Sequence, residues 1–265
     1  MQACIIPKRI IKIKAVRMLT KADIKLVKSL GDKNVRNTNS LFVAEGNKSV
    51  VDLIISKIKP QQIYALASWL NQQTPDFLSQ LPFVEISQKE LEQMSSLQST
   101  REVIGVFHMP KPVFNPSELN GLILALDTIQ DPGNLGTLIR LADWYGVKHI
   151  LCSPQTVDCY NSKVIQSTMG SIGRVSIHYG DLADWFKTIN LPIIAASMEG
   201  QASRIFDFPQ DMILLLGNEG SGINPQLRAM VNKTIRIEKR GLAESLNVAV
   251  AGAILVDRYF GQFEF

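Results

Sequence analysis

Three loops in the second half of this 265-residue chain hold the residue types that could do chemistry. The first follows the apolar run 122–126 and passes through Pro132 and Gly133 into a helical pattern that carries Arg140. An apolar strand, a glycine turn and a helix start in this order are typical of a nucleotide-binding loop. Neither G-x-G-x-x-G nor G-x-x-x-x-G-K-[ST] occurs there, however, which argues against a dinucleotide or a triphosphate as the ligand.

The helical pattern after this loop predicts where its polar residues lie. Asn134 is a candidate N-cap, because its side chain can accept hydrogen bonds from the first free amides of a helix. Arg140 falls outside the apolar stripe of the helix, on the same side as Gly136. We expect this glycine to leave room for a ligand backbone to reach the arginine. The buried stripe is predicted to comprise Leu135, Leu138, Ile139 and Ala142.

The second and third loops also follow apolar runs. Residues 217–222, G-N-E-G-S-G, hold three glycines in six residues, so we expect free backbone amides to line a slot there. After the run 234–237, Ser245 leads into a helix with small residues on one face, which suits close backbone packing. Each loop alone also fits an ordinary turn or cap, but parallel strands would place all three at one edge of a sheet. The small-residue face comprises Ala249, Gly252, Ala253 and Val256.

Strand-like and helix-like segments alternate along the chain, which predicts an α/β fold with two domains. Residues 110–120 contain three prolines and no periodicity, and they are the predicted linker between a domain at 18–109 and a domain at 121–265. In the first domain, we predict strands at 41–46, 62–67 and 103–109, helices at 20–30, 47–57 and 90–97, and a polar loop at 31–40.

The second domain shows five apolar runs that are continuous rather than alternating. This pattern favours a mainly parallel sheet that is buried on both faces. In such a sheet, ligands bind beyond the carboxyl ends of the strands. We predict strands at 122–126, 147–152, 192–196, 212–216 and 234–237, and helices at 136–145 and 182–189.

Positive charge is concentrated at the start of the chain. The net charge is +4, but residues 1–60 hold 13 lysines and arginines against four acidic residues. A basic first quarter favours a polyanion such as RNA as the partner, although a solvated lysine-rich helix would give the same counts. Lys28, Lys33 and Arg36 are the predicted RNA contacts.

The first 17 residues carry five cations and no acidic residue, whereas Met18 opens a regular amphipathic pattern. We therefore predict that translation starts at Met18 and that residues 1–17 are a spurious or flexible leader. The three cysteines have no metal-ligand spacing, which favours idle thiols in a reducing cytosol. No apolar run approaches the length of a membrane span. We expect a cytoplasmic protein with no metal and no membrane partner.

The three loops carry motifs that resemble, in order and spacing, the signatures of the SpoU/TrmH family. These are RNA ribose 2′-O-methyltransferases of the SPOUT class. The motifs are N-x-G-x-x-x-R at 134–140, L-G-N-E-G-x-G at 216–222 and E-S-L-N-V-A-V-A at 244–251. The resemblance covers residues 121–265. The basic front domain, through K-N-V-R-N-T-N-S-L-F-V-A-E-G at 33–46, is similar to the ribosomal-protein-L30e-like RNA-binding domain that many members carry.

The resemblance implies a fold and a reaction that spacing alone does not. The last strand and helix would thread through a loop to form a trefoil knot, a rare exception to the rule against knots. The knot loops would hold S-adenosylmethionine, mainly through backbone groups, and a homodimer through the C-terminal domain would complete the site, with the small-residue helix as a fitting interface. The implied donor contacts are Gly217, Ile237 and Leu246. The implied catalytic and substrate positions are Asn134, Arg140, Glu219, Ser245 and Asn247.

The favoured function is methylation of a ribose 2′-hydroxyl in structured RNA, with 23S ribosomal RNA preferred because of the front domain. A tRNA 2′-O-methyltransferase and a non-catalytic RNA-binding or ribosome-assembly protein are the alternatives. Arg140 is either the general base or a clamp for the adjacent phosphate. Deprotonating an arginine at pH 7 costs about 8 kcal/mol, because its pKa exceeds 12, so the clamp requires less free energy.

One position departs from the family pattern. The family usually reads I-P-M-x-G before its S-L-N, whereas this chain has Ile237-Glu238-Lys239-Arg240-Gly241. The rim of the predicted donor slot is therefore more charged than usual. We expect the backbone contacts to the donor to be kept. The charged side chains of Glu238 and Lys239 can either change donor affinity or leave it unchanged.

Overall fold

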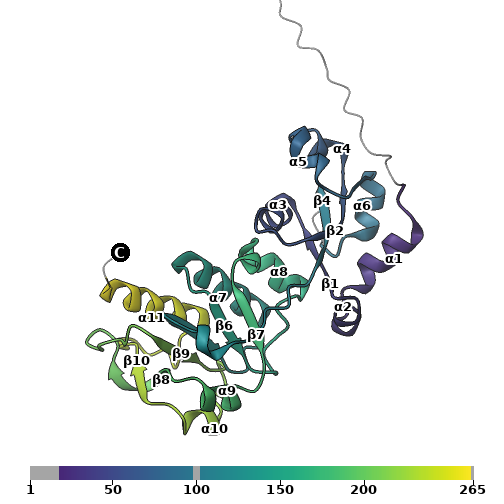
Figure 1. Ribbon diagram of the computed structural model, residues 1–265. Helices are drawn as coiled ribbons and strands as arrows, with labels where there is room; N and C mark the ends of the chain where they lie inside the picture. The colour runs from purple at the N-terminus through teal and green to yellow at the C-terminus, as the bar shows by residue number, and fades with distance from the viewer. Residues whose placement is uncertain (1–17, 98–101, 264–265) are drawn as a thin grey trace, which may run out of the picture. The chain divides into compact units, whose positions relative to one another are not determined.

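A computed structural model describes residues 18–97 and 102–263 (Figure 1). The predicted leader, residues 1–17, lies outside the described residues. The described residues divide into two compact units, the first made of residues 18–50, 59–97 and 102–108 and the second of residues 51–58 and 109–263. None of the described helices is long and apolar enough to cross a membrane.

The first unit is built on a four-stranded sheet in the order β1-β4-β2-β3. The strands β1 and β2 pair antiparallel to β4, and β3 pairs parallel to β2. Tyr64, Ile104 and Leu91 are among the buried residues that form its core. The strands are β1 (Leu41–Glu45), β2 (Pro60–Ala65), β3 (Phe83–Glu85) and β4 (Val103–His108), and the helices are α1 (Lys21–Ser29), α2 (Lys33–Asn39), α4 (Ala67–Leu70), α5 (Pro75–Ser79) and α6 (Gln88–Met94). Helix α3 (Asn47–Ile55) begins in this unit, and its residues 51–55 are assigned to the second unit.

Helix α1 begins one residue after the predicted start, with Thr20 as its N-cap. The hydroxyl oxygen of Thr20 accepts from the backbone amide of Asp23, and the Asp23 carboxylate accepts in return from the amide of Thr20. The prediction of a polar loop at 31–40 is wrong, because helix α2 forms there. The Asp32 carboxylate accepts from the amides of Asn34 and Val35, and this cap starts a helix that has too few apolar residues to show a period.

The second unit contains a six-stranded sheet in the order β10-β8-β9-β5-β6-β7, and each neighbouring pair is parallel. The prediction of a mainly parallel sheet is therefore confirmed. The strands are β5 (Leu122–Leu126), β6 (His149–Cys152), β7 (Ser176–Tyr179), β8 (Ile193–Ala202), β9 (Met212–Leu216) and β10 (Lys233–Arg236). The helices are α7 (Pro132–Tyr145), α8 (Ser162–Thr168), α9 (Leu182–Thr188), α10 (Pro225–Arg228) and α11 (Val248–Gln262), with short 3₁₀ turns η1 (Pro116–Glu118) and η2 (Ser171–Gly173). The trefoil knot stays a prediction.

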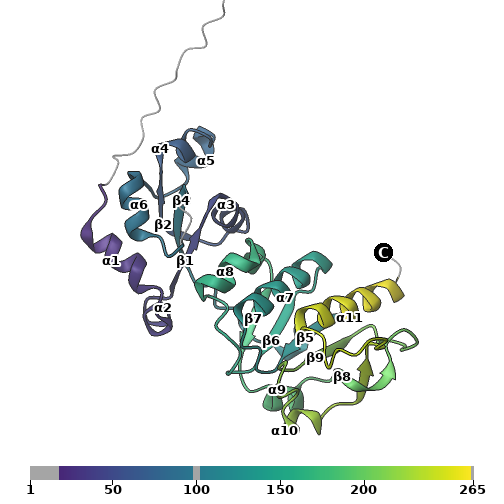
Figure 2. The same ribbon diagram turned by 180° about the vertical axis from the view of Figure 1, so that it is seen from behind.

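Alternate residues of the central strands face two different helix layers. Ile123, Ile213 and Leu215 pack with Phe186 of α9 and Leu227 of α10. On the other face, Gly252 of α11 lies against side chains of α7 and β9, and Figures 1 and 2 show α7 and α11 side by side over this face. All residues of β5 and β9 are buried, as their continuous apolar runs predict.

Gly136 has a different role from the predicted one. A Cβ atom at this position would overlap the Cβ atom of Ser167 and lie 3.2 Å from the carbonyl oxygen of Val164, both on α8. The glycine therefore allows α7 and α8 to approach each other closely. The prediction that it opens a path for a ligand to Arg140 is wrong.

The small-residue face of α11 is occupied within the chain. Ala249, Gly252 and Val256 are buried, and a Cβ at Gly252 would lie 2.8 Å from a methyl of Leu138 and 3.1 Å from a methyl of Leu216. The face packs closely, as predicted, but against leucine side chains of α7 and β9 of the same chain rather than against another backbone. A dimer interface would have to use another surface of the helix.

Replacing Gly136 by alanine is expected to lower the free energy of unfolding by about 1–3 kcal/mol, because the new methyl forces α7 away from α8. Urea denaturation of the full chain measures this change. Gly261→Ala on helix α11 of the same unit is the matched control, since a Cβ atom at that position would meet nothing within 4 Å. The control should be neutral or slightly stabilising. Equal stability of Gly136→Ala and wild type would show that the contact is not tight.

Candidate active site

Two adjacent strands bring the first two motif loops to the same edge of the sheet. Strands β5 and β9 pair in parallel, with Leu126 opposite Leu216. Each strand ends at that residue, so the segments that begin at Asp127 and Gly217 leave the sheet side by side. This placement follows the rule that ligand sites lie beyond the carboxyl ends of parallel strands.

Buried polar contacts fix the two loops to each other. Asp127 is 3% exposed, and its Oδ2 accepts from the backbone amide of Asn224 at 2.7 Å. Thr128 adopts a left-handed conformation with φ of 58°, and its carbonyl accepts from Nδ2 of Asn218 at 2.9 Å. These roles of Asp127 and Asn218 do not follow from the motifs. A polar residue within two positions of the end of a buried apolar run is the signal that could have identified both.

The loop after β9 is a tight turn organised by Asn218. Its Oδ1 accepts from the amides of Gly220 and Ser221 at 2.9 and 3.0 Å, and its backbone pairs in both directions with Gly222. A Cβ at Gly217 would lie 2.6 Å from the backbone of Gly222 and 2.7 Å from Ile223. The lack of a side chain at Gly217 is therefore needed to close the loop, whatever ligand it meets. The prediction of free amides lining a slot is wrong for residues 218 and 220–222, because their amides donate within the loop.

Asn134 does not cap helix α7. The cap is Asp131, whose Oδ1 accepts from the backbone amide of Asn134 at 2.8 Å, and Pro132 occupies the first helical position. The side chain of Asn134 is thus free of capping and contacts the other two motifs. Its Nδ2 donates to Oε1 of Glu219, and its Oδ1 accepts from Nδ2 of Asn247 at 2.8 Å.

Asn247 completes the network from the third motif. Its Oδ1 accepts from the amides of Ala249 and Val250 at 2.9 and 3.3 Å, which makes it the N-cap of α11. Ser245 leads into this helix, as expected; it lies two residues before the cap and is exposed. We refer to Asn134, Glu219 and Asn247 as the amide–carboxylate network.

Arg140 is not part of this network. It lies six residues after Asn134 on α7, or about 9 Å along the helix axis, and its side chain is exposed. Within residues 18–97 and 102–263, no hydrogen bond or ion pair engages its guanidinium. The structure therefore gathers three of the five predicted catalytic residues, and leaves Arg140 and Ser245 unattached at the surface.

The predicted donor contacts lie at the same carboxyl edge of the sheet as the network. Gly217 and Ile237 directly follow β9 and β10 and are half-buried, while the side chain of Leu246 is 46% exposed. Over the described residues, the backbone groups of 237–246 make no main-chain hydrogen bond. Free main-chain donors and acceptors, with exposed apolar side chains at Leu242 and Leu246, fit the adenine and methionine parts of S-adenosylmethionine.

Two of the three predicted RNA contacts are at the surface. Lys28 and Lys33 are exposed at the end of α1 and the start of α2. Arg36 is 3% exposed, and its Nη1 donates to the carbonyls of Leu30 and Gly31 at 2.9 and 2.8 Å. Its prediction as an RNA contact is wrong, because the buried guanidinium holds the end of α1.

Other reactive side chains of the second unit lie outside the site. Burial raises the pKa of the thiols of Cys152 and Cys159, so both stay protonated and unreactive at neutral pH. His149 and His178 lie against each other, with Nδ1 and Nε2 3.5 Å apart, and burial lowers the pKa of both rings. No group of three or more His, Cys, Asp or Glu in the described part of the chain could hold a metal ion.

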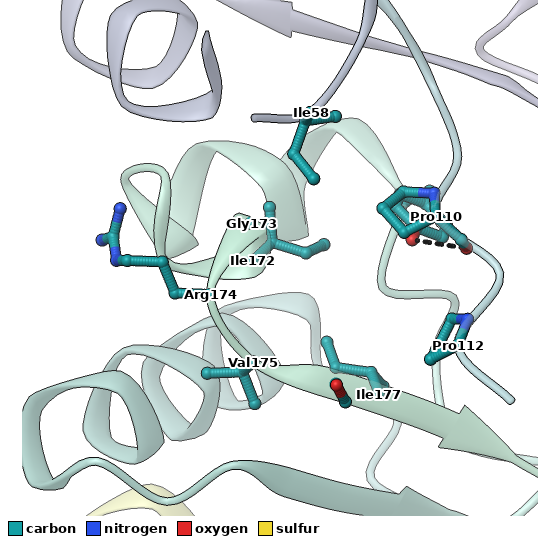
Figure 3. Close-up of a pocket in the computed structure, with 10 residues that line it drawn as sticks. Ile58, Pro110, Pro112, Ile172, Gly173, Arg174, Val175 and Ile177 are labelled. Atoms are coloured by element: carbon teal, nitrogen blue, oxygen red, sulfur yellow. Dashed lines mark hydrogen bonds between the residues drawn. The ribbon is translucent and has the colours of Figure 1, made fainter. Parts of the chain in front are cut away.

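A cavity of about 140 Å³ lies elsewhere in the second unit (Figure 3). The start of the predicted linker covers it, with the hydroxyl of Tyr160 donating to the carbonyl of Pro110 at 3.4 Å. Its walls include Pro110, Pro112, Ile172, Val175 and Ile177, and none of the predicted site residues. The cavity is therefore separate from the candidate site.

Asn134→Asp should test the network by placing a carboxylate against Glu219. Repulsion raises the folded-state pKa of one carboxyl above its unfolded value, so stability falls as the pH rises above about 4. We expect the variant to match wild type near pH 4 and to lose about 1 kcal/mol of unfolding free energy by pH 8. Urea denaturation at several pH values measures this. The matched control is Asn190→Asp, at an exposed asparagine. A pH-independent difference between Asn134→Asp and wild type would argue against the contact.

Comparison with known proteins agrees with this geometry. Residues 121–257 match the SpoU rRNA Methylase family, and residues 21–105 match the MRM3-like substrate binding domain. A curated relative, the 23S rRNA (guanosine(2553)-2′-O)-methyltransferase RlmP of Bacillus subtilis, is 28% identical over 86% of this chain and 92% of its own length.

Two solved structures match nearly the whole chain. A putative TrmH-family RNA methyltransferase from Porphyromonas gingivalis is 31% identical, with a TM-score of 0.80 over 92% of this chain and 98% of that chain. An AdoMet-bound rRNA methyltransferase from Sinorhizobium meliloti is 25% identical, with a TM-score of 0.83 over 94% of this chain and 99% of that chain. The resemblance predicted from the three motifs is confirmed: this chain belongs to the SpoU rRNA methylase family.

Proposed function

We propose that this protein transfers a methyl group from S-adenosylmethionine to a ribose 2′-hydroxyl of structured RNA, with 23S ribosomal RNA as the substrate. The observation that carries the proposal is the amide–carboxylate network, which joins one residue from each of the three motifs at a single edge of the sheet. The matched methylase family and the named 23S rRNA activity of the Bacillus subtilis relative support the same reaction.

S-adenosylmethionine would supply a methyl group on a sulfonium centre; attack of the ribose oxygen on the methyl carbon would break the carbon–sulfur bond and release S-adenosylhomocysteine as a neutral thioether. The protein must then hold the 2′-hydroxyl in line and accept its proton. In the network, Nδ2 of Asn134 donates a hydrogen bond to Oε1 of Glu219 and so orients this exposed carboxylate. Its Oε2 is left available to the ribose. The hydroxyl of Ser245 is a second exposed acceptor close in sequence to Asn247.

Arg140 is proposed to bind the phosphate next to the target ribose. Its guanidinium is exposed and engages no other described residue, so it can present two donors to one phosphate group. Removing its proton is not required in this role. The late transfer of the 2′-hydroxyl proton to phosphate, to water or to Glu219 is compatible with a permanently charged arginine.

A second copy of the chain is proposed to complete the site. Six residues along α7 turn Arg140 about 120° around the helix axis from Asn134, and within the described residues no hydrogen bond joins it to the network of its own chain. Trp144 lies one turn after Arg140 on α7, and Val250 lies on the neighbouring helix α11; their side chains are 85% and 48% exposed. These apolar side chains suit a homodimer that brings Arg140 of one copy toward the network of the other. The molar mass in solution tests the homodimer.

The first unit is proposed to bind the RNA through exposed lysines of α1 and α2, including Lys28 and Lys33. The match of residues 21–105 to a substrate binding domain supports this division of labour. We also propose a cytoplasmic location, because the proposed substrate is ribosomal RNA. The domain boundaries at 109–110 and 120–121 remain predictions made from the sequence.

A deletion strain complemented with variants tests the reaction and the role of Arg140 together. Wild type should restore a 2′-O-methyl mark in 23S ribosomal RNA, and Arg140→Ala should not, with donor binding retained because the side chain faces away from the core.

Arg140→Lys separates the two roles. Partial activity without a new pH dependence supports the clamp, whereas activity that rises with pH near the ordinary lysine pKa supports a base. A mark restored fully by Arg140→Ala would remove Arg140 from the site.

Charge removal at Lys28 and Lys33 should weaken RNA binding in a salt-dependent way. For the double variant Lys28→Gln and Lys33→Gln, we expect the log–log slope of affinity against salt to fall by roughly 0.7–0.9 per lost phosphate contact. Filter binding over a salt series measures the slope. Lys187→Gln is the control, because this lysine is already paired with Asp184 on α9. An unchanged slope in the double variant would assign these lysines to a solvated face.

A further inference from the structure

The segment between β10 and α11, residues 237–247, is attached to the rest of its unit at two points. We call it the donor loop, because it carries Ile237 and Leu246. Residues 239–247 are all exposed. In the described part of the chain, its polar contacts with other segments come from Glu238 at one end and Asn247 at the other. Asn247 belongs to the amide–carboxylate network, so the opposite end depends on Glu238.

Glu238 contacts two arginines that are distant from it in the sequence. Its Oε2 accepts from Nη1 of Arg258 on α11 at 3.0 Å and lies 3.8 Å from Nε of Arg204. Its Oε1 accepts from the backbone amide of Arg204 at 3.4 Å. Arg204 lies between β8 and β9. One carboxylate therefore joins the start of the donor loop, helix α11 and the connection between β8 and β9.

The pair with Arg258 is more sheltered than an ordinary surface ion pair. The side chains of Glu238 and Arg258 are 27% and 19% exposed, compared with 69% and 61% for Asp184 and Lys187 on α9. Desolvation acts to raise the pKa of Glu238, but its hydrogen bonds and the charge of Arg258 outweigh this and lower it. The carboxylate is therefore ionised at neutral pH. Without it, the guanidinium of Arg258 would lose the partner that holds it near the donor loop.

We propose that Glu238 is a positioning residue, whose ion pairs with Arg258 and Arg204 hold the donor loop in the place that binds S-adenosylmethionine. This inference rests on the proposed function. The family that the chain resembles usually has proline at this position, and a proline restrains the backbone through its ring. In this chain the restraint is ionic instead. Donor affinity therefore depends on the charge at position 238 and on the salt concentration.

Titration of the full-length chain with S-adenosylmethionine at low and high salt tests the proposal. Glu238→Gln keeps the size of the side chain and removes its charge. Wild type should bind the donor less tightly at high salt. The variant should bind about tenfold more weakly than wild type at low salt and change little as salt rises. Thermal unfolding without the donor should differ far less between the two proteins than the donor affinity does.

Two further variants separate positioning from a general effect of lost charge. Asp184→Asn removes an exposed ion pair on α9 and should leave donor affinity and its salt dependence unchanged. Arg258→Gln should weaken donor binding, and combining it with Glu238→Gln should add no further loss, because both remove the same pair. If Glu238→Gln does not fold, Arg204→Gln removes the more exposed contact and should weaken donor binding by a smaller factor.

The outcomes distinguish this inference from the proposed function. Donor affinity and salt dependence that are equal in wild type and Glu238→Gln would overturn the positioning role while leaving the methyltransferase proposal intact. Losses that add in the double variant would also overturn it. If wild type itself fails to bind S-adenosylmethionine, the proposed function is wrong instead.

Discussion

The side-chain amide of Asn134 is the interaction on which the candidate site depends, because it donates and accepts at the same time. Its nitrogen donates to Glu219 of the loop after β9, and its oxygen accepts from Asn247 at the start of α11. Neither a carboxylate nor an amine could make both contacts, since one lacks a donor and the other lacks an acceptor. The three motifs are therefore joined through a residue type that has few substitutes.

The network can form only because the two loops beneath it are rigid. The β5–β9 pairing fixes where the loops begin, and Asp127 and Asn218 then tie them together with hydrogen bonds to backbone groups. A buried carboxylate such as Asp127 is costly unless its oxygens are satisfied. Here the amide of Asn224 and the hydroxyl of Thr128 satisfy it. The need to satisfy this buried carboxylate therefore favours the loop arrangement in which these hydrogen bonds form.

The sequence predicted five of the six strands of the second unit and the identity of the motif residues, because continuous apolar runs and short polar motifs are local signals. Strand β7 (Ser176–Tyr179) was missed, because its S-I-H-Y sequence is not a continuous apolar run. It did not predict what depends on distant partners. Asp131 and Asn134 are both good caps, and Pro132 at the first helical position favours Asp131 only once the helix start is known. A glycine such as Gly136 can face a ligand or another helix, and only the position of α8 decides between them. The buried state of Arg36 likewise depends on carbonyls at the end of α1, which no charge count reveals.

The residues left unattached are as informative as those in the network. Asn134, Glu219 and Asn247 are held in place before any ligand arrives, which avoids the entropy cost of ordering them during binding. Arg140, Ser245 and most of the donor loop are exposed and make few polar contacts within the described residues. These are the groups proposed to meet phosphate, ribose and donor, whose own polar atoms can complete the missing contacts. The fold therefore fixes the groups that need each other and leaves free the groups whose partners are the proposed substrates.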